Sequence, residues 1–126
     1  MEIKKNILVI DDDAHIRRVI ELKLRNAGYQ VLIAKDGEEG LNLIESLHPD
    51  VVITDIVMPK LDGRAVCMKA DEFKKEWPFL TLIITCSLTF DEKKLVNTMK
   101  DTQFMEKPFS PNKILQCVDQ YLGIER

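Results

Sequence analysis

Short apolar runs alternate along this chain with segments of helical periodicity, and this alternation limits the folds that the chain can adopt. Five runs predict strands, at residues 6–10, 30–34, 51–54, 80–84 and 103–106. The first and third are apolar rather than alternating, which is typical of strands covered on both faces of a parallel sheet. Strands that alternate with helices predict one α/β domain over residues 1–126, a (βα)5 doubly wound, five-stranded parallel sheet.

The segments between these strands carry apolar residues at helical spacing. Asp12 or Asp13 can cap the first helix, and Ser110 followed by Pro111 predicts the start of the fifth. The fourth helix, around residues 92–99, is short and rich in lysine. The apolar faces of the other four comprise Ile16, Val19, Ile20, Leu24 and Ala27; Leu41, Ile44 and Leu47; Val66, Ala70 and Phe73; and Ile114, Leu115, Val118, Tyr121 and Leu122.

Polar residues follow the ends of four predicted strands. They are Asp11, Asp12, Asp55, Thr85 and Lys107. Parallel strands bring their carboxyl ends to one edge of the sheet, where ligands bind in open α/β folds. Carboxylates suit Mg²⁺, and an aspartate beside such a cation can accept a phosphoryl group. A lysine and a threonine hydroxyl can contact phosphoryl oxygens. The pattern predicts a site for a divalent cation and a phosphoryl group.

Each of these residues also has an ordinary structural explanation. Asp11, Asp12 and Asp13 could merely cap the first helix, and Asp55 could form a turn. Thr85 could serve the strand end alone, and Lys107 could be a solvated surface lysine. The combination is more specific than its members, because all of them fall at matching ends of four strands.

Composition narrows the class of partner. The 126 residues are 45% hydrophobic and 31% charged with a net charge of −3, so a globular domain without the basic footprint of direct nucleic-acid binding is expected. No apolar stretch approaches the roughly 20 residues of a membrane span, so no membrane partner is expected. Cys67, Cys86 and Cys117 form no CxxC pair, and three reduced thiols in a cytoplasmic protein are expected.

Four motifs resemble those of response-regulator receiver domains, over essentially the whole chain. They are LVIDDD at residues 8–13, VVITDIVMP at 51–59 with DG at 62–63, IIT at 83–85, and KPF at 107–109. The resemblance implies a flavodoxin-like sheet with strand order 2-1-3-4-5. By position, Asp55 matches the phospho-accepting aspartate. Asp11 and Asp12 match the acidic pair that holds Mg²⁺ with Asp55 and the backbone carbonyl of Val57.

The resemblance further implies a switch rather than an enzyme, with self-phosphorylation from small donors and self-dephosphorylation. Lys107 matches the lysine that contacts the phosphoryl oxygens, and its bond to Pro108 is expected to be cis. Thr85 matches the switch hydroxyl, and Phe104 matches the aromatic residue that changes exposure with it. A sensor histidine kinase or phosphotransfer protein would supply the phosphoryl group. The fourth helix, fifth strand and fifth helix would bind an output protein or domain, and a phosphorylation-dependent homodimer is an option.

Three places depart from the family pattern. Residues 99–101 read Met-Lys-Asp where receivers often have Ala-Gly-Ala, which predicts an unusual turn before the fifth strand. Cys86 replaces a smaller residue beside the expected pocket, and we expect a buried, inert thiol that narrows access for bulky donors. Val57 and Ser87 occupy positions that tune the approach of water, and an apolar Val57 predicts slow to moderate self-dephosphorylation.

Two other functional classes fit the residues less well. An aspartyl-phosphate phosphohydrolase of the haloacid-dehalogenase type needs a second aspartate two residues after the first, where this chain has Val57. A flavodoxin-like FMN carrier would need a hydroxyl-rich loop after the first strand, where residues 11–13 would repel phosphate. The sequence leaves open a stand-alone regulator or the N-terminal receiver of a longer protein.

Overall fold

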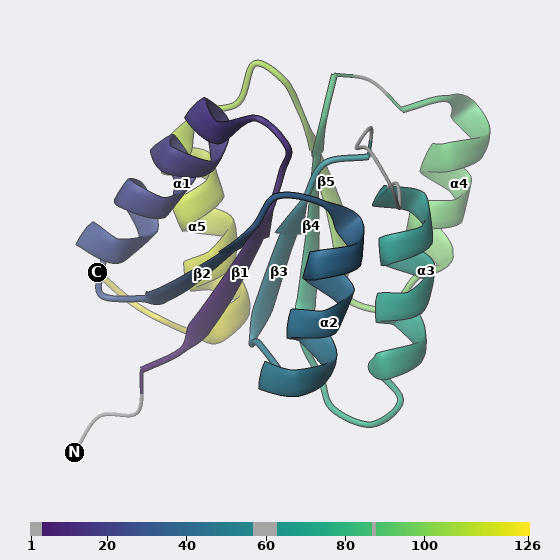
Figure 1. Ribbon diagram of the computed structural model, residues 1–126. Helices are drawn as coiled ribbons and strands as arrows, with labels where there is room; N and C mark the ends of the chain where they lie inside the picture. The colour runs from purple at the N-terminus through teal and green to yellow at the C-terminus, as the bar shows by residue number, and fades with distance from the viewer. Residues whose placement is uncertain (1–3, 57–62, 87) are drawn as a thin grey trace.

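The computed structural model describes residues 4–56, 63–86 and 88–126 (Figure 1). Within these residues five strands alternate with five helices. In chain order they are β1 (Asn6–Ile10), α1 (Ala14–Asn26), β2 (Gln30–Ala34), α2 (Gly37–Leu47), β3 (Val51–Thr54), α3 (Gly63–Phe73), β4 (Leu80–Thr85), α4 (Phe90–Thr98), β5 (Thr102–Glu106) and α5 (Pro111–Leu122). In this described part of the chain, no helix is both long and apolar enough to cross a bilayer.

The strands form one parallel sheet in the order β2-β1-β3-β4-β5, which confirms the predicted fold class and strand order. Helices α1 and α5 cover one face of the sheet, and α2, α3 and α4 cover the other (Figure 1). Two covered faces explain the apolar strands: in β1, Ile7 and Val9 pack toward α1 and α5, whereas Leu8 and Ile10 pack toward α2 and α3. Each such side chain stabilises the fold by about 1.5–3 kcal/mol when fully buried.

A third apolar cluster lies under α3 and α4. Its buried residues include Cys67 from α3, Val96 from α4 and Ile83 from β4, and Phe104 of β5 packs against it half-buried. Ile56, directly after Asp55, is a further buried member. This cluster therefore links the residue after one predicted site aspartate to β5.

Register aligns the carboxyl ends of the strands. Ile10 of β1 pairs with Thr54 of β3, and the two strands are parallel. The residues that follow them, Asp11 and Asp55, therefore leave the sheet side by side. At the other side, Thr85 pairs with Glu106, the residue before Lys107. The backbone N–H of Lys107 donates to the Thr85 carbonyl at 2.7 Å. The fold thus gathers the predicted site residues at one edge.

Capping residues fix where the helices begin. Asp13, one of the two predicted candidates, caps α1 by accepting from the N–H groups of His15 and Ile16. Ser110 caps α5 with Pro111 in its first turn, as predicted. For α4, Thr89 and Glu92 form a reciprocal capping box, so this helix begins earlier than the lysine-rich pattern indicated.

Several boundaries and exposures differ from the prediction. Strand β4 extends through Thr85 and β5 begins at Thr102, one residue beyond each predicted bound, because their ladder continues there. Leu47, which was predicted on the apolar face, is 44% exposed because it is the last residue of α2. Cys86 is exposed, so the expectation of a buried thiol was wrong; it lies just past the covered end of β4.

Candidate functional site

Three aspartates converge at the carboxyl edge of β1 and β3. Asp11 is 3% exposed and Asp55 is 8% exposed, whereas Asp12 faces solvent. One carboxylate oxygen from each can be chosen so that all three lie within 4.8 Å of one another. The structure therefore brings together the three side chains that the sequence singled out, with one open side at Asp12. Oxygen ligands at this spacing are compatible with a divalent cation.

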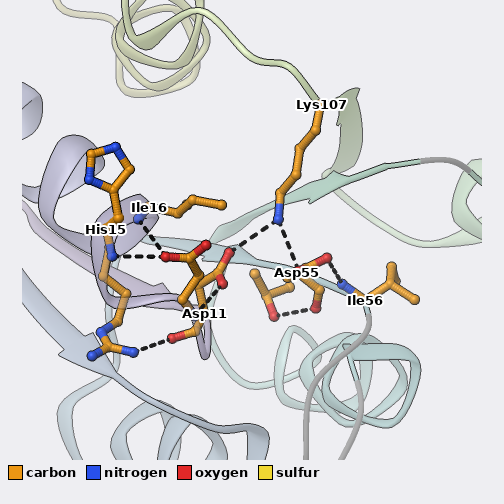
Figure 2. Close-up of polar contacts among 9 residues, drawn as sticks. Asp11, His15, Ile16, Asp55, Ile56 and Lys107 are labelled. Atoms are coloured by element: carbon orange, nitrogen blue, oxygen red, sulfur yellow. Dashed lines mark hydrogen bonds and ion pairs between the residues drawn. The ribbon is translucent and has the colours of Figure 1, made fainter.

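Lys107 reaches into this cluster from the segment after β5 (Figure 2). Its Nζ donates to Asp55 Oδ2 at 3.0 Å and lies 3.6 Å from Asp11 Oδ2. The peptide bond from Lys107 to Pro108 is cis, as predicted. One ammonium against three carboxylates leaves the cluster with excess negative charge, which a bound cation would neutralise.

The environment shifts the ionisation of two of these groups. Burial raises the pKa of Asp11 above its ordinary value, and the charges of Asp55 and Asp12 add to the rise. A hydrogen bond from the Asp13 N–H and the charge of Lys107 act in the opposite direction without cancelling it. Ionised Asp11 is therefore held in an unfavourable position that a cation would relieve.

The pKa of Lys107 moves in the direction that keeps it charged. Burial acts to lower this pKa, but the hydrogen bond to Asp55 and the charges of Asp11 and Asp55 outweigh burial and raise it. Lys107 is thus a permanent cation at neutral pH, aimed at one oxygen of Asp55. That arrangement suits the stabilisation of added negative charge at this oxygen.

Backbone groups orient both buried carboxylates. Asp55 Oδ1 accepts the N–H of Ile56 at 2.7 Å, and Asp11 Oδ1 accepts the N–H of Asp13 at 2.9 Å (Figure 2). Each aspartate therefore keeps its other oxygen, Oδ2, toward Lys107. Asp55 Oδ2 accepts from Lys107 alone among the hydrogen bonds of the described residues, whereas Oδ1 is bound to the backbone.

Thr85 and Phe104 lie on neighbouring strands beside this cluster. Thr85 is 2% exposed at the end of β4. Phe104 pairs with Ile83, two residues before Thr85, and is half-buried with Lys93 Nζ 5.9 Å from its ring centre. Both predicted switch residues are thus on the β4–β5 side of the site. The metal ligand predicted at Val57 and the tuning position Ser87 lie outside the described residues.

Sequence analysis missed one side chain that shapes the site. Arg17 donates from Nη1 to the backbone carbonyl of Asp11 at 2.7 Å and so ties the acidic loop to α1. Its spacing of one helical turn after the N-cap Asp13 is the signal that could have found it.

Comparison with known proteins agrees with this geometry. The family model described as "Response regulator receiver domain" matches residues 7–119. A "Probable transcriptional regulator ycf27" from Porphyridium aerugineum is 39% identical over 111 residues, which are 88% of this chain and 45% of that protein. The "Alkaline phosphatase synthesis transcriptional regulatory protein PhoP" of Bacillus subtilis is 37% identical over 110 residues, 87% of this chain and 45% of that protein. The chain therefore spans slightly less than half the length of these curated relatives.

Solved structures share the fold along almost the whole chain. A CheY-like receiver domain protein from Methanospirillum hungatei superposes with a TM-score of 0.87 at 26% identity, covering 96% of this chain and 95% of that one. The chemotaxis protein CheY4 of Vibrio cholerae gives a TM-score of 0.84 at 26% identity, covering 94% and 99%.

Proposed function

Because the chain belongs to the response regulator receiver domain family, a family of signalling switches in two-component systems, we propose that it accepts a phosphoryl group on Asp55. The donor is the phosphohistidine of a sensor histidine kinase or phosphotransfer protein. Asp55 Oδ2 attacks phosphorus, the bond from phosphorus to the histidine nitrogen breaks, and the imidazole leaves with the electron pair. The observation that carries this proposal is Asp55 Oδ2 lying 3.0 Å from Lys107 Nζ inside an acidic cluster.

Asp11, Asp12 and Asp55 would hold Mg²⁺, with the backbone carbonyl of Val57 as a further ligand implied by the family pattern. When bound, Mg²⁺ would supply Lewis-acid neutralisation of charge on the transferring phosphoryl group. The raised pKa of Asp11 supports this assignment, because it marks a carboxylate whose charge lacks enough compensation from the protein alone.

Lys107 would keep the acceptor ready and then hold the product. Before transfer, its hydrogen bond orients Asp55 Oδ2, and the raised pKa of Lys107 keeps the ammonium charged. After transfer, the same ammonium would contact phosphoryl oxygens, which carry about −1.5 to −2 charge near neutral pH.

The added charge would act as a switch through Thr85 and Phe104. Thr85 would donate its hydroxyl to a phosphoryl oxygen, and Phe104 would repack in the third apolar cluster as Thr85 moves. The surface made by α4, β5 and α5 would then bind an output partner or a second copy of the chain. The basic residues Lys93, Lys94 and Lys100, with Asn97, lie on or just after α4 and would favour an acidic partner.

The family and the named relatives support a proposal for the wider setting of this chain. We place residues 1–126 in one receiver domain that acts in the cytoplasm. The two relatives described above are named as transcriptional regulators and are about twice as long as this chain, which supports an output domain that binds DNA. The net charge of −3 supports a receiver that does not itself bind nucleic acid.

Incubation with acetyl phosphate and Mg²⁺ tests the proposal, with intact mass as the measurement. One added phosphoryl group is expected, absent with EDTA and absent in Asp55→Asn. Asp13→Asn is the matched control, because asparagine caps a helix as well as aspartate and residue 13 lies outside the cluster. Phosphorylation that persists in Asp55→Asn, or none in the unaltered protein, would contradict the proposal.

A further inference from the structure

The two ends of α4 are tied to α3 by contacts of very different kinds. The helices lie side by side over the third apolar cluster (Figure 1). The N-terminal end of α4 lies toward the edge that carries Asp55 and Thr85, because α4 follows β4. Its C-terminal end lies toward the opposite edge, where β5 begins. The contacts at each end decide which end can move.

The C-terminal end is held by a buried lysine. Lys74, directly after α3, is 4% exposed. Its Nζ donates to the carbonyl of Lys100 at 2.5 Å, the carbonyl of Asp101 at 2.9 Å and the Thr102 hydroxyl at 3.1 Å. Asp71 of α3 accepts the N–H of Lys100 at 3.0 Å. Three hydrogen bonds thus bind the turn after α4 to the end of α3, and a fourth binds the first residue of β5.

The ammonium of Lys74 stabilises a turn with an unusual backbone conformation. The residues Met99, Lys100 and Asp101 include no glycine, yet Asp101 has a φ of +46°, a left-handed conformation that non-glycine residues seldom adopt. Three oxygens accept hydrogen bonds from Lys74 Nζ, so the positive charge of the lysine lies among them. The Phe79 ring centre lies 5.0 Å from the same Nζ. Contacts with the end of α3 therefore help to fix the turn.

The N-terminal end is held by an exposed ion pair. Arg64 Nε of α3 lies 2.5 Å from Glu92 Oε2 of α4, and their side chains are 52% and 15% exposed. Exposed pairs of this type are weak and sensitive to salt. Glu92 also accepts the N–H of Thr89 in the capping box, so the helix keeps its cap when Arg64 is removed.

We propose that α4 pivots about its C-terminal end, with Lys74 as the fixed anchor and the Arg64–Glu92 pair as the latch that opens. A small cavity lies beneath the helix, and Ile56, Leu88 and Glu92 are among the residues that line it. Opening of the latch rests on the proposed phosphorylation of Asp55, which is followed directly by Ile56. The anchor does not rest on it.

Amide hydrogen exchange of the unphosphorylated protein, followed by NMR, tests the anchor and the latch separately. Lys74→Met should speed exchange of the Thr81 and Lys100 amides about tenfold. Thr81 reports on the turn because its N–H donates to Asp101. Arg64→Met should speed exchange of the Glu92 and Lys93 amides about threefold and leave Thr81 and Lys100 unchanged.

Two further variants keep this test decisive. Lys69→Met makes the same chemical change at an exposed lysine of α3 and should alter neither group of amides. Lys74→Gln retains a hydrogen-bond donor and should speed exchange of the Thr81 and Lys100 amides less than Lys74→Met. It replaces the methionine variant in this test if that variant folds poorly. Equal effects of Lys69→Met and Lys74→Met on Thr81 and Lys100 would overturn the anchor.

Phosphorylation with acetyl phosphate and Mg²⁺ tests the pivot. The Glu92 and Lys93 amide signals should shift, and those of Thr81 and Lys100 should stay in place. Shifts at Thr81 and Lys100 as large as those at Glu92 would overturn the pivot. Intact mass of the same sample separates the two proposals: a phosphorylated protein without movement of α4 refutes the pivot alone, whereas no added phosphoryl group refutes the proposed function.

Discussion

Two lysines reach inward at opposite edges of the sheet and meet different partners. Lys107 Nζ faces the carboxylates of Asp55 at 3.0 Å and Asp11 at 3.6 Å. Lys74 Nζ faces the backbone carbonyls of Lys100 and Asp101. Burial acts to lower the pKa of both ammonium groups. The carboxylates reverse this effect and raise the pKa of Lys107, whereas burial lowers the pKa of Lys74 from 10.5 to about 8.

The difference separates an arrangement suited to bind a cation or a phosphoryl group from one that fixes the geometry of a turn. Around Lys107 the charges are unequal, since three carboxylates face one ammonium, and a cation or phosphoryl group changes that balance. Around Lys74 the nearest oxygens are mostly neutral dipoles that fix geometry and leave the ammonium short of compensation. Uncompensated charge is negative at the site and positive at the anchor, so the two regions should respond in opposite ways to pH.

The largest expected effect is the pH dependence caused by Lys74. Its pKa is about 8 when folded and 10.5 when exposed, so the unfolded chain binds more protons between these values. The free energy of unfolding should therefore rise with pH across this window, by up to about 3 kcal/mol. Urea titrations at about pH 7 and about pH 10 should show this rise in the unaltered protein and not in Lys74→Met. Equal pH dependence in both proteins would contradict it.

Removal of Lys107 should act on stability at the other end of the pH range. Lys107→Met leaves Asp11 and Asp55 without their ammonium, which should lower the free energy of unfolding at neutral pH by about 2 kcal/mol. The loss should shrink as pH falls and the carboxylates take up protons, and millimolar Mg²⁺ should restore part of it. Thermal unfolding at two pH values, with and without Mg²⁺, measures this. A loss that is the same at all pH values would show a packing effect instead.

Neutralising the carboxylate of Asp11 should raise the stability of the fold, whereas removing Lys107 should lower it. Because burial raises the pKa of Asp11, the folded state binds more protons than the unfolded state just above the ordinary pKa of 3.8, and this contribution to stability is lost as pH rises. Asp11→Asn should therefore raise the midpoint of thermal unfolding by about 4 °C at neutral pH without Mg²⁺. It should also abolish the further stabilisation by Mg²⁺. A lower midpoint than that of the matched Asp13→Asn would refute the interpretation.

The smallest expected effects are changes in the rate of phosphorylation caused by modifying the cysteine near Lys107, compared with the cysteine near Lys74. Exposed Cys86 lies close enough to Lys107 to influence its pKa, and buried Cys67 does the same for Lys74. A thiol reagent should label Cys86 about tenfold faster than Cys67. Labelled protein should accept phosphate more slowly, whereas Cys86→Ala should react somewhat faster with bulky donors. Unchanged phosphorylation after complete labelling of Cys86 would show that this residue does not border the entry path.

The sequence was sufficient to predict which residues meet around Lys107, but not which residues meet around Lys74. Asp11, Asp55 and Lys107 follow strands whose apolar composition reports burial on both faces, and parallel pairing then places them at one edge. The anchor could not be predicted, because two of the three partners of Lys74 are backbone carbonyls 26 and 27 residues later, and a carbonyl leaves no trace in residue identity. Cys86 was misjudged for a related reason: its exposure depends on where the cover of β4 ends.

Location of the phosphoryl group tests the central claim most directly. Protein treated with acetyl phosphate and Mg²⁺ is reduced with borohydride, which converts an aspartyl phosphate to homoserine, and its peptides are sequenced by mass spectrometry. We predict homoserine at position 55 and unaltered aspartate at Asp11 and Asp12. Homoserine at either of those two positions, or phosphate on another residue type, would contradict the account.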